Sequence, residues 1–235
     1  IIHSDKRFSY EEAQTVLETG EGPFNKELKK LNQLAYALKK DRFKKGAVNF
    51  ETTEVKFKLD ANGKPLAVIP KVRKDAHKLI EEFMLLANKR VATYIFNMKK
   101  GEQKNTFVYR THDHPDPQKV QDFALFAKQF GHTLAIEDKS ISKSLNSLME
   151  EIEGKPEQNV LQSLAVRAMA KAKYTTEAKG HFGLAFDHYS HFTSPIRRYP
   201  DMMAHRLLQH YIDGKASADK AVYEKKCIHS SEREK

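Results

Sequence analysis

Two prolines five residues apart, Pro195 and Pro200, constrain the backbone of this chain more than any other local feature. Proline lacks the N–H that a helix interior needs, so one helix cannot run through both positions. Thr193 or Ser194 is a good N-cap and Pro195 suits a first helical position, but Pro200 would break a helix begun there. We therefore predict a tight turn first, and a continuous helix that starts at Pro200.

Two arginines, Arg197 and Arg198, fall inside this turn and precede Asp201. Backbone N–H groups at a helix start lack intrahelical partners, and the helix dipole favours an anion there. A guanidinium adds a planar fork of donors that matches phosphate oxygens in pairs. The pattern is typical of a phosphate site, although ordinary surface charges at a helix start would look the same. In the helix that follows, the expected buried residues are Met203, Leu207 and Leu208.

Apolar periodicity divides the rest of the chain into helices and short strands. Ser9 and Glu12 form a capping box, and Asn62-Gly63 predicts a hairpin turn. Helices are expected at 9–18, at 28–38 with Gly46 as the stop, and at about 75–98, 117–130, 140–152 and 156–173. Strands are expected at AVNF (47–50), 55–59, 65–69, FVYR (107–110) and TLAI (133–136). The inner side of the 75–98 helix should carry Leu79, Ile80, Phe83, Met84, Ala87 and Val91. The fold class is α+β, one helix-rich unit with a small mostly antiparallel sheet.

Composition narrows the functional classes. The formal net charge is +10, from 41 basic and 31 acidic side chains, which favours a polyanionic partner such as nucleic acid without requiring one. No apolar run approaches the roughly 18 residues of a membrane span, so no membrane partner is expected. The single cysteine, Cys227, cannot form an internal disulfide and fits a reducing cytoplasm. The chain opens on Ile1 without Met, and we expect it to be part of a larger protein.

Four further side chains carry possible binding chemistry. Tyr10 begins the first helix beside a basic turn, where a tyrosine is most often half-buried packing. Glu81 and Glu82 are adjacent on the long helix and point about 100° apart, so they cannot share one role. At least one should approach the buried side, where a salt bridge is the ordinary explanation. Phe50 closes AVNF, and both core packing and base stacking remain open for it.

Other kinds of site are less well supported. His181, His188, His191 and His205 fit no closed zinc spacing. The run HDHPDP (112–117) looks metal-like but is better explained as a proline-rich helix entry. A Ser-His-Asp hydrolase is possible in composition, but the sequence has no G-x-S-x-G elbow.

The stretch HFTSPIRRYPDMMAHRLL (191–208) resembles, almost residue for residue, the signature of the ribonuclease II and ribonuclease R family, the RNB catalytic domain. IIHSDKRFSYEEAQ (1–14) and DAHKLIEEFMLLANKRVA (75–92) resemble the bacterial ribonuclease R branch of that family. The resemblance runs in order over nearly the whole chain. It implies that residues 1–235 are the C-terminal part of one RNB domain, in a processive 3′-to-5′ exoribonuclease. Such an enzyme releases nucleoside 5′-monophosphates from single-stranded or structured RNA with Mg²⁺.

The same resemblance implies roles for individual residues. Arg197 matches a catalytic arginine that stabilises charge developing on the scissile phosphate, and Arg198 is either a second phosphate contact or structural. Tyr10 matches a tyrosine that bonds the sugar of the terminal nucleotides. Glu81 matches a residue that recognises the ribose 2′-hydroxyl, with its neighbour as a structural partner. Phe50 matches a phenylalanine on which the terminal bases stack.

The sequence lacks the metal-binding feature of the family. Its members hold two divalent ions with aspartates in a D-x-D-D type motif, and no two aspartates are adjacent here. The resemblance implies that this cluster and the cold-shock domains lie upstream, and an S1 domain downstream. We therefore expect a chain that carries the phosphate clamp and part of the nucleotide pocket and is inactive alone. Two alternatives are a non-catalytic RNA-binding module and a scaffold without a ligand.

Overall fold

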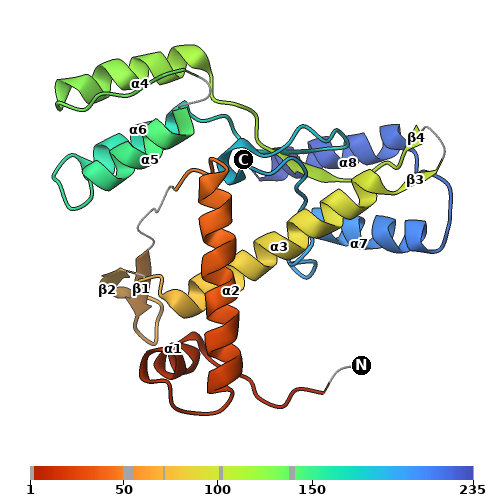
Figure 1. Ribbon diagram of the computed structural model, residues 1–235, viewed down its shortest axis with the longest axis horizontal. Helices are drawn as coiled ribbons and strands as arrows, with labels where there is room; N and C mark the ends of the chain where they lie inside the picture. Colours follow the sequence, from red (N-terminus) through yellow and green to blue (C-terminus); the bar gives the residue numbers. More distant parts are fainter. Residues whose placement is uncertain (1–2, 50–54, 71, 101–102, 138–140, 235) are drawn as a thin grey trace. The chain divides into compact units, whose positions relative to one another are not determined.

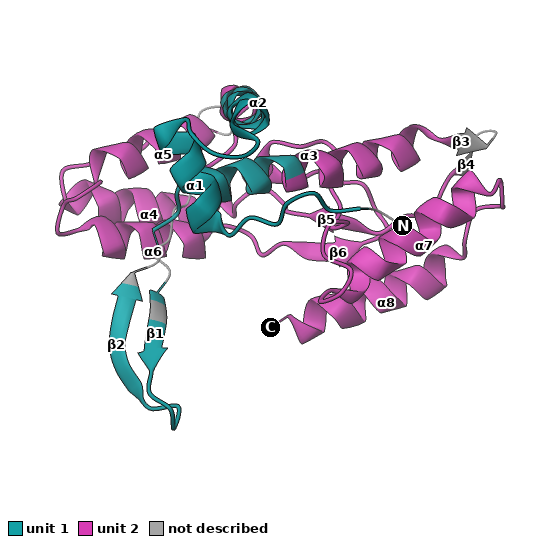
Figure 2. Ribbon diagram, turned by 90° about the horizontal axis from the view of Figure 1, so that it is seen from below, with its two compact units in different colours: residues 1–41, 51–83 teal, residues 42–50, 84–235 magenta. Residues whose placement is uncertain are grey.

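The computed structural model describes residues 3–49, 55–70, 72–100, 103–137 and 141–234. The chain divides into two compact units (Figure 2). One comprises residues 1–41 and 51–83, and the other comprises residues 42–50 and 84–235. Each unit is built mainly of helices.

The strands of the described residues form three separate antiparallel pairs. These are β1 with β2 and β3 with β4 (Figure 1), and β5 with β6 (Figure 2). The helices are α1 (Tyr10–Thr19), α2 (Asn25–Lys44), α3 (Asp75–Asn97), α4 (Pro117–Gln129), α5 (Ile141–Glu151), α6 (Gln158–Ala168), η1 (Phe182–Leu184, a 3₁₀ turn), α7 (Tyr199–Ile212) and α8 (Lys220–Arg233). The strands are β1 (Val55–Leu59), β2 (Pro65–Pro70), β3 (Lys99–Lys100), β4 (Gln103–Lys104), β5 (Tyr109–Thr111) and β6 (Lys173–Thr175). The expected helix-rich α+β class is confirmed.

In the first unit, α1 begins and ends where local signals predict. Ser9 Oγ accepts the N–H of Glu12 and the Glu12 carboxylate accepts the N–H of Ser9, so the capping box is complete. Gly20 ends the helix with φ of 75°, a conformation that strains glycine least. Gln14 Oε1 accepts the backbone N–H of Ala76 at 2.9 Å, which ties α1 to the start of α3.

The expected hairpin also forms. β1 and β2 pair with Phe57 opposite Val68, and Gly63 in the connecting turn has φ of 81°. Asp60 supports the turn, because its carboxylate accepts the N–H groups of Asn62 and Lys64.

In the second unit, α4, α5 and α6 share one apolar core. Asp116 caps α4 by accepting the N–H groups of Gln118 and Lys119, and Pro117 occupies the first helical turn. The buried residues of this core include Phe123, Leu145, Leu148, Ile152 and Leu161.

A second core of the same unit surrounds the β5–β6 pair. It joins the C-terminal part of α3 to α7 and α8, and it fixes the chain just before the two prolines. Tyr211 donates its hydroxyl proton to the carbonyl of Thr106, which pins α7 to the segment before β5. The buried residues of this core include Ile95, Phe107, Val108, Tyr174, Met203, Leu207 and Cys227.

Two expected strands do not form. Residues 47–49 of AVNF have no strand geometry, because Val48 donates its N–H to the carbonyl of Gly183 and Asn49 donates to the side chain of Asn146. TLAI is irregular as well, and Ala135 donates its N–H to Ser144 Oγ. These backbone groups bond to the 3₁₀ turn η1 and to helix side chains instead of to a strand. Phe50 lies outside the described residues.

Other expectations need smaller corrections. Ile80, expected on the inner side of α3, is exposed because it lies on the wall of a surface pocket. The last helix, α8, was not expected, although it buries Cys227. None of the described helices is long and apolar enough to cross a bilayer.

Candidate functional site

The turn between the two prolines has the predicted form. Residues 195–197 are a tight turn, and α7 begins at Tyr199, one residue before the expected start. Both arginines donate their backbone N–H to the carbonyl of Ser194, at 3.3 Å from Arg197 and 3.1 Å from Arg198. The turn thus closes on itself before the helix begins.

Asp201, in the first turn of α7, contacts both the start of this turn and Arg198. It is completely buried, and its Oδ1 accepts the backbone N–H of Ser194 at 2.8 Å. Arg198 forms an ion pair with the same carboxylate. Its NH2 donates a hydrogen bond to Oδ1 at 3.0 Å, and its Nε lies 2.8 Å from Oδ2. One charged hydrogen bond and a second close contact between opposite charges restrain both side chains. Arg198 therefore holds the turn together, which matches the structural alternative for this residue.

Arg197 faces solvent. Its guanidinium has one weak contact, from NH2 to Ser194 Oγ at 3.4 Å, and it pairs with no carboxylate of the described residues. Ile196 beside it is 103% exposed, so the tip of the turn projects from its unit. An exposed guanidinium on a rigid turn is suited to hold a phosphate.

One part of the expected phosphate site is wrong. We expected an anion to use backbone N–H groups around Arg197 and Arg198. These two groups are occupied by Ser194 O, and Asp201 accepts the N–H of Ser194. The carboxylate of Asp201 itself supplies the negative charge that the start of α7 favours. An external anion would meet side chains of this turn.

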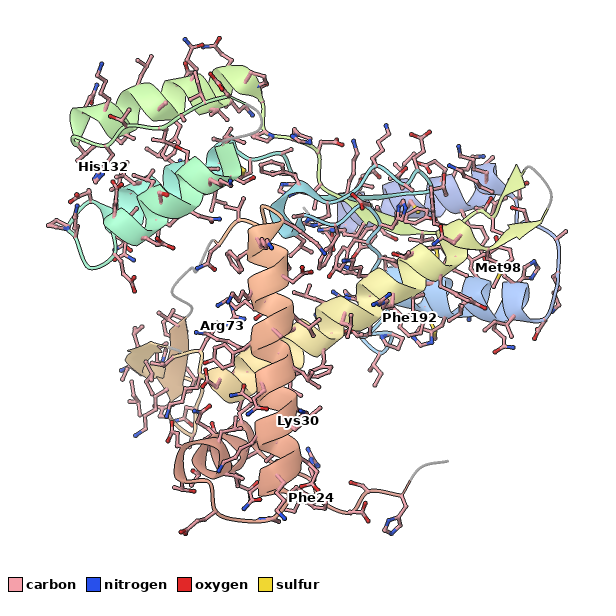
Figure 3. The ribbon with its side chains drawn as sticks, in the orientation of Figure 1. Phe24, Lys30, Arg73, Met98, His132 and Phe192 are labelled. Carbon is pink, nitrogen blue, oxygen red and sulfur yellow. The ribbon has the colours of Figure 1, made fainter. Side chains whose placement is uncertain are left out.

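Asn88 is a supporting residue that the sequence did not reveal. It is buried on α3, where its Oδ1 accepts the N–H groups of Phe192 and Thr193 at 2.9 and 3.2 Å (Figure 3 labels Phe192). Its Nδ2 donates to the hydroxyl of Tyr189 at 3.1 Å. One buried amide thus fixes the chain that leads into the turn. In the sequence Asn88 lies between the apolar run Leu85-Leu86-Ala87 and two basic residues, so nothing local marks its role.

A cluster of imidazole, phenol and guanidinium groups lies behind the turn in the same unit. Tyr174 contacts His191 Nδ1 at 2.8 Å and donates to Glu234 at 3.1 Å, and Arg110 lies over the Tyr174 ring. Burial lowers the pKa of His181 to about 3. Burial, reinforced by the positive charge of Arg198, lowers the pKa of His191 to about 3.

This cluster makes stability depend on pH. In the unfolded chain both histidines titrate near 6.5, whereas the folded pKa of each is about 3. The contribution of the two histidines to the free energy of unfolding should be fully present above about pH 6.5. It should fall as the pH is lowered toward 3, by up to about 1.4 kcal/mol per pH unit for each histidine. His191→Phe should reduce this slope by about one group between pH 6.5 and 5, as measured by urea unfolding. His229→Asn, at an exposed position, is the control. An unchanged slope in His191→Phe would contradict the assignment.

In the first unit, Tyr10 stacks on His77. Their ring centroids are 4.1 Å apart with an interplanar angle of 11°, and Tyr10 remains 46% exposed. His77 precedes Glu81 by four residues on α3, so the two side chains share one face of the helix. His77 therefore links two predicted RNA contacts, because it stacks on Tyr10 and lies one helical turn before Glu81. His77 was not among the predicted site residues, although its spacing to Glu81 was a usable signal.

The adjacent glutamates separate as expected. Glu81 is 39% exposed and forms an ion pair with Arg73, which lies just before α3 (labelled in Figure 3). Glu82 is buried. The prediction that at least one of them points inward is confirmed, and only Glu81 is available to a ligand.

A pocket of about 370 Å³ opens beside Tyr10. It is mostly apolar and lies entirely within the first unit. Its walls come from the segment before α1 and from α1, α2 and α3, namely Phe8, Ser9, Tyr10, Ala13, Leu17, Leu28, Ala76, Leu79 and Ile80. Tyr10 thus presents a ring and a hydroxyl at the edge of an apolar hollow, which suits contact with a sugar or a base.

Among the described residues, no three His, Cys, Asp or Glu side chains are grouped so that they could share one metal ion. In HDHPDP, His112 uses both ring nitrogens for structure, since Nε2 bonds to the carbonyl of Ala170 and Nδ1 accepts the N–H of Gly183. Asp116 of the same run is the cap of α4.

Comparison with known proteins assigns the family. Residues 1–214 match the family described as RNB domain. The chain belongs to the RNB family. Among curated RNB proteins, it is 35% identical to ribonuclease R of Aquifex aeolicus over 221 residues and 38% identical to that of Thermotoga maritima over 219 residues. Each alignment covers 91% of this chain but 30% of the relative. The chain thus spans about a third of the length of its RNB relatives.

Solved structures agree with the RNB assignment. Mycoplasma genitalium RNase R, in complex with ribose-methylated single-stranded RNA, matches 96% of this chain with a TM-score of 0.83 and 25% identity, and the match covers 36% of that protein. Yeast Ssd1, described as a pseudonuclease, matches 95% with a TM-score of 0.71 and 21% identity, and the match covers 27% of it. The second likeness concerns the fold alone.

Proposed function

We propose that this chain is the RNA-holding part of a longer 3′-to-5′ hydrolytic exoribonuclease that releases nucleoside 5′-monophosphates from single-stranded or structured RNA. Membership in the RNB family and the coverage of about a third of each ribonuclease R support the proposal. The net charge of +10 suits a polyanionic substrate. The cytoplasm is the proposed location, in keeping with a single buried cysteine.

The observation that carries the proposal is the unequal use of the two arginines. Arg198 is locked onto buried Asp201, whereas Arg197 projects into solvent from the turn that this pair holds rigid. A fixed cationic donor stabilises negative charge where it develops on a phosphate and needs no reorganisation during the reaction. Arg197 takes this catalytic role. Arg198 contributes to RNA binding by orienting the turn.

The 3′ nucleotides contact the first unit. Tyr10 bonds the sugar, and Glu81 accepts a hydrogen bond from the ribose 2′-hydroxyl, the group that distinguishes RNA from DNA. Phe50 provides a stacking surface for the terminal bases. The exposure of Tyr10 and Glu81 on one face supports the first two roles.

The family's divalent metal, Mg²⁺ in this proposal, does not fit the described residues, which contain no suitable cluster of ligands. Its aspartate ligands belong to another part of the longer protein. The purified chain should therefore bind RNA weakly and release no monophosphates. Release of nucleoside monophosphates from oligo(A) by the chain with Mg²⁺, detected by chromatography, would contradict this division.

Substitution of Glu81 tests the proposed RNA contact. Glu81→Ala should lower the ratio of oligo(A) to oligo(dA) affinity about tenfold, because the hydrogen bond from the 2′-hydroxyl to a carboxylate is lost. The ratio is the proper readout, since Arg73, released from its partner, would strengthen binding to both strands alike. Fluorescence anisotropy at fixed salt provides both affinities. Glu27→Ala, at an exposed position of α2, is the control. An unchanged ratio would remove the role of Glu81.

A second function is a non-catalytic RNA-binding module. The match to yeast Ssd1 shows that this fold also occurs in a pseudonuclease. The two functions differ in whether the flanking sequence of the longer protein supplies the aspartate cluster. If that cluster is absent, the module is favoured.

A further inference from the structure

The stacked pair of Tyr10 and His77 joins two helices of the first unit. The near-parallel rings lie 4.1 Å apart, so His77 covers one face of Tyr10. Tyr10 is still 46% exposed, which leaves the rest of its ring and its hydroxyl to solvent. A tyrosine held in this way has one orientation to offer a ligand.

His77 is itself fixed by the start of α3. It occupies the third position of the helix, and its Nδ1 accepts the N–H of Lys74, the residue before the helix, at 3.4 Å. Its own N–H donates to the carbonyl of Lys74 at 3.0 Å. A side-chain acceptor at the third position normally comes from Glu or Gln. The imidazole provides this cap and a flat ring together.

The helix that carries Tyr10 is anchored to the same place. Gln14, one turn after Tyr10, accepts the N–H of Ala76, and Lys74 pairs with Glu18 at 3.7 Å. The stacked rings are therefore one of several links between α1 and the start of α3. The stacked rings differ from the other two links in contacting the Tyr10 side chain itself.

We infer that His77 is a positioning residue. It lies one helical turn from Glu81 and orients the Tyr10 ring so that Tyr10 and Glu81 meet the same terminal nucleotide. This inference rests on the proposed function. Without the imidazole, Tyr10 regains its rotamers and must lose them again when RNA binds. With the imidazole in place, the stacked rings of Tyr10 and His77 form a platform that is already oriented before RNA binds.

Two substitutions separate positioning from helix capping. His77→Phe keeps a flat ring under Tyr10 but removes the acceptor for the N–H of Lys74. His77→Gln keeps an acceptor suited to the third helical position but removes the ring. If His77 positions Tyr10, RNA affinity should be kept in His77→Phe and reduced in His77→Gln. If His77 only caps α3, RNA affinity and stability should both be kept in His77→Gln and reduced in His77→Phe.

The affinity of the full 235-residue chain for a fluorescein-labelled oligoadenylate, measured by anisotropy, tests the inference. His77→Gln should weaken binding as much as Tyr10→Ala does, about fivefold or more, and His77→Phe should restore most of the affinity. Because both act through one platform, the double variant Tyr10→Ala/His77→Gln should bind no more weakly than Tyr10→Ala. His229→Gln on α8 is the control.

The possible failures can be told apart. If Tyr10→Ala weakens binding and His77→Gln does not, the positioning role is wrong and the proposed function stands. If the unaltered chain does not bind oligoadenylate, the proposed RNA contact fails, and the NMR shifts of the Tyr10 ring protons decide about His77. Loss of their ring-current shift in His77→Gln, with retention in His77→Phe, supports the platform. Equal shifts in both variants overturn it.

Discussion

Arg197→Ala in the longer nuclease should lower turnover about 10²- to 10³-fold while RNA affinity falls no more than about threefold. The magnitude is that of removing one preorganised donor from a developing negative charge. The structure supports this division, because the Arg197 guanidinium is exposed and the turn is held without it, by Ser194, Arg198 and Asp201. Single-turnover release of nucleoside monophosphates would measure the first quantity, and equilibrium binding with Mg²⁺ omitted would measure the second.

Two controls sharpen this experiment. Arg206→Ala removes another exposed cation from α7 and should leave turnover nearly unchanged. Arg197→Lys keeps the charge but loses the planar fork, and should recover only part of the rate. Equal losses of rate and affinity in Arg197→Ala would reduce Arg197 to an ordinary phosphate contact.

Asp201→Ala should destabilise the second unit by about 3 to 5 kcal/mol, the cost of removing one partner from a buried ion pair. The substitution leaves the Arg198 guanidinium without its carboxylate and the N–H of Ser194 without its acceptor. Asp201→Asn should cost less, because an amide oxygen can still accept from Ser194. Urea unfolding followed by circular dichroism would measure both values.

Asp122→Ala is the matched control for stability. Asp122 is an exposed helical aspartate that accepts a hydrogen bond from Gln118, so its loss should cost less than about 0.5 kcal/mol. If Asp201→Ala were as mild as Asp122→Ala, the buried pair would not be what holds the turn.

Helices were the part of the fold that could be predicted best from the sequence. The capping box of Ser9 and Glu12, the αL position of Gly20 and the cap of Asp116 are contacts among residues close in the chain. Their geometry depends on local dihedral angles and nearby N–H groups, so residue spacing is sufficient to find them. The family signature added the candidate residues.

Strands, and residues that support the site from a distance in sequence, could be predicted less well. AVNF and TLAI have apolar patterns of the right length, but a strand needs a neighbour, and Val48 instead finds the carbonyl of Gly183. Asn88, which fixes the chain before Arg197, is distant in sequence from the backbone that it holds. Apolar periodicity contains no information about such partners.

By itself, the sequence determined the proline-bounded turn and the position of two arginines inside it, because proline restricts the backbone wherever it occurs. Only the tertiary structure decided which arginine is free. The buried Asp201 carboxylate lies next to Arg198 and needs a partner, so these two side chains pair. The Arg197 guanidinium remains exposed to solvent. In the same way, packing of α1 on α3 decided that Tyr10 meets His77. Local geometry follows from neighbouring residues, whereas the choice between equivalent side chains follows from which of them the fold buries beside a partner.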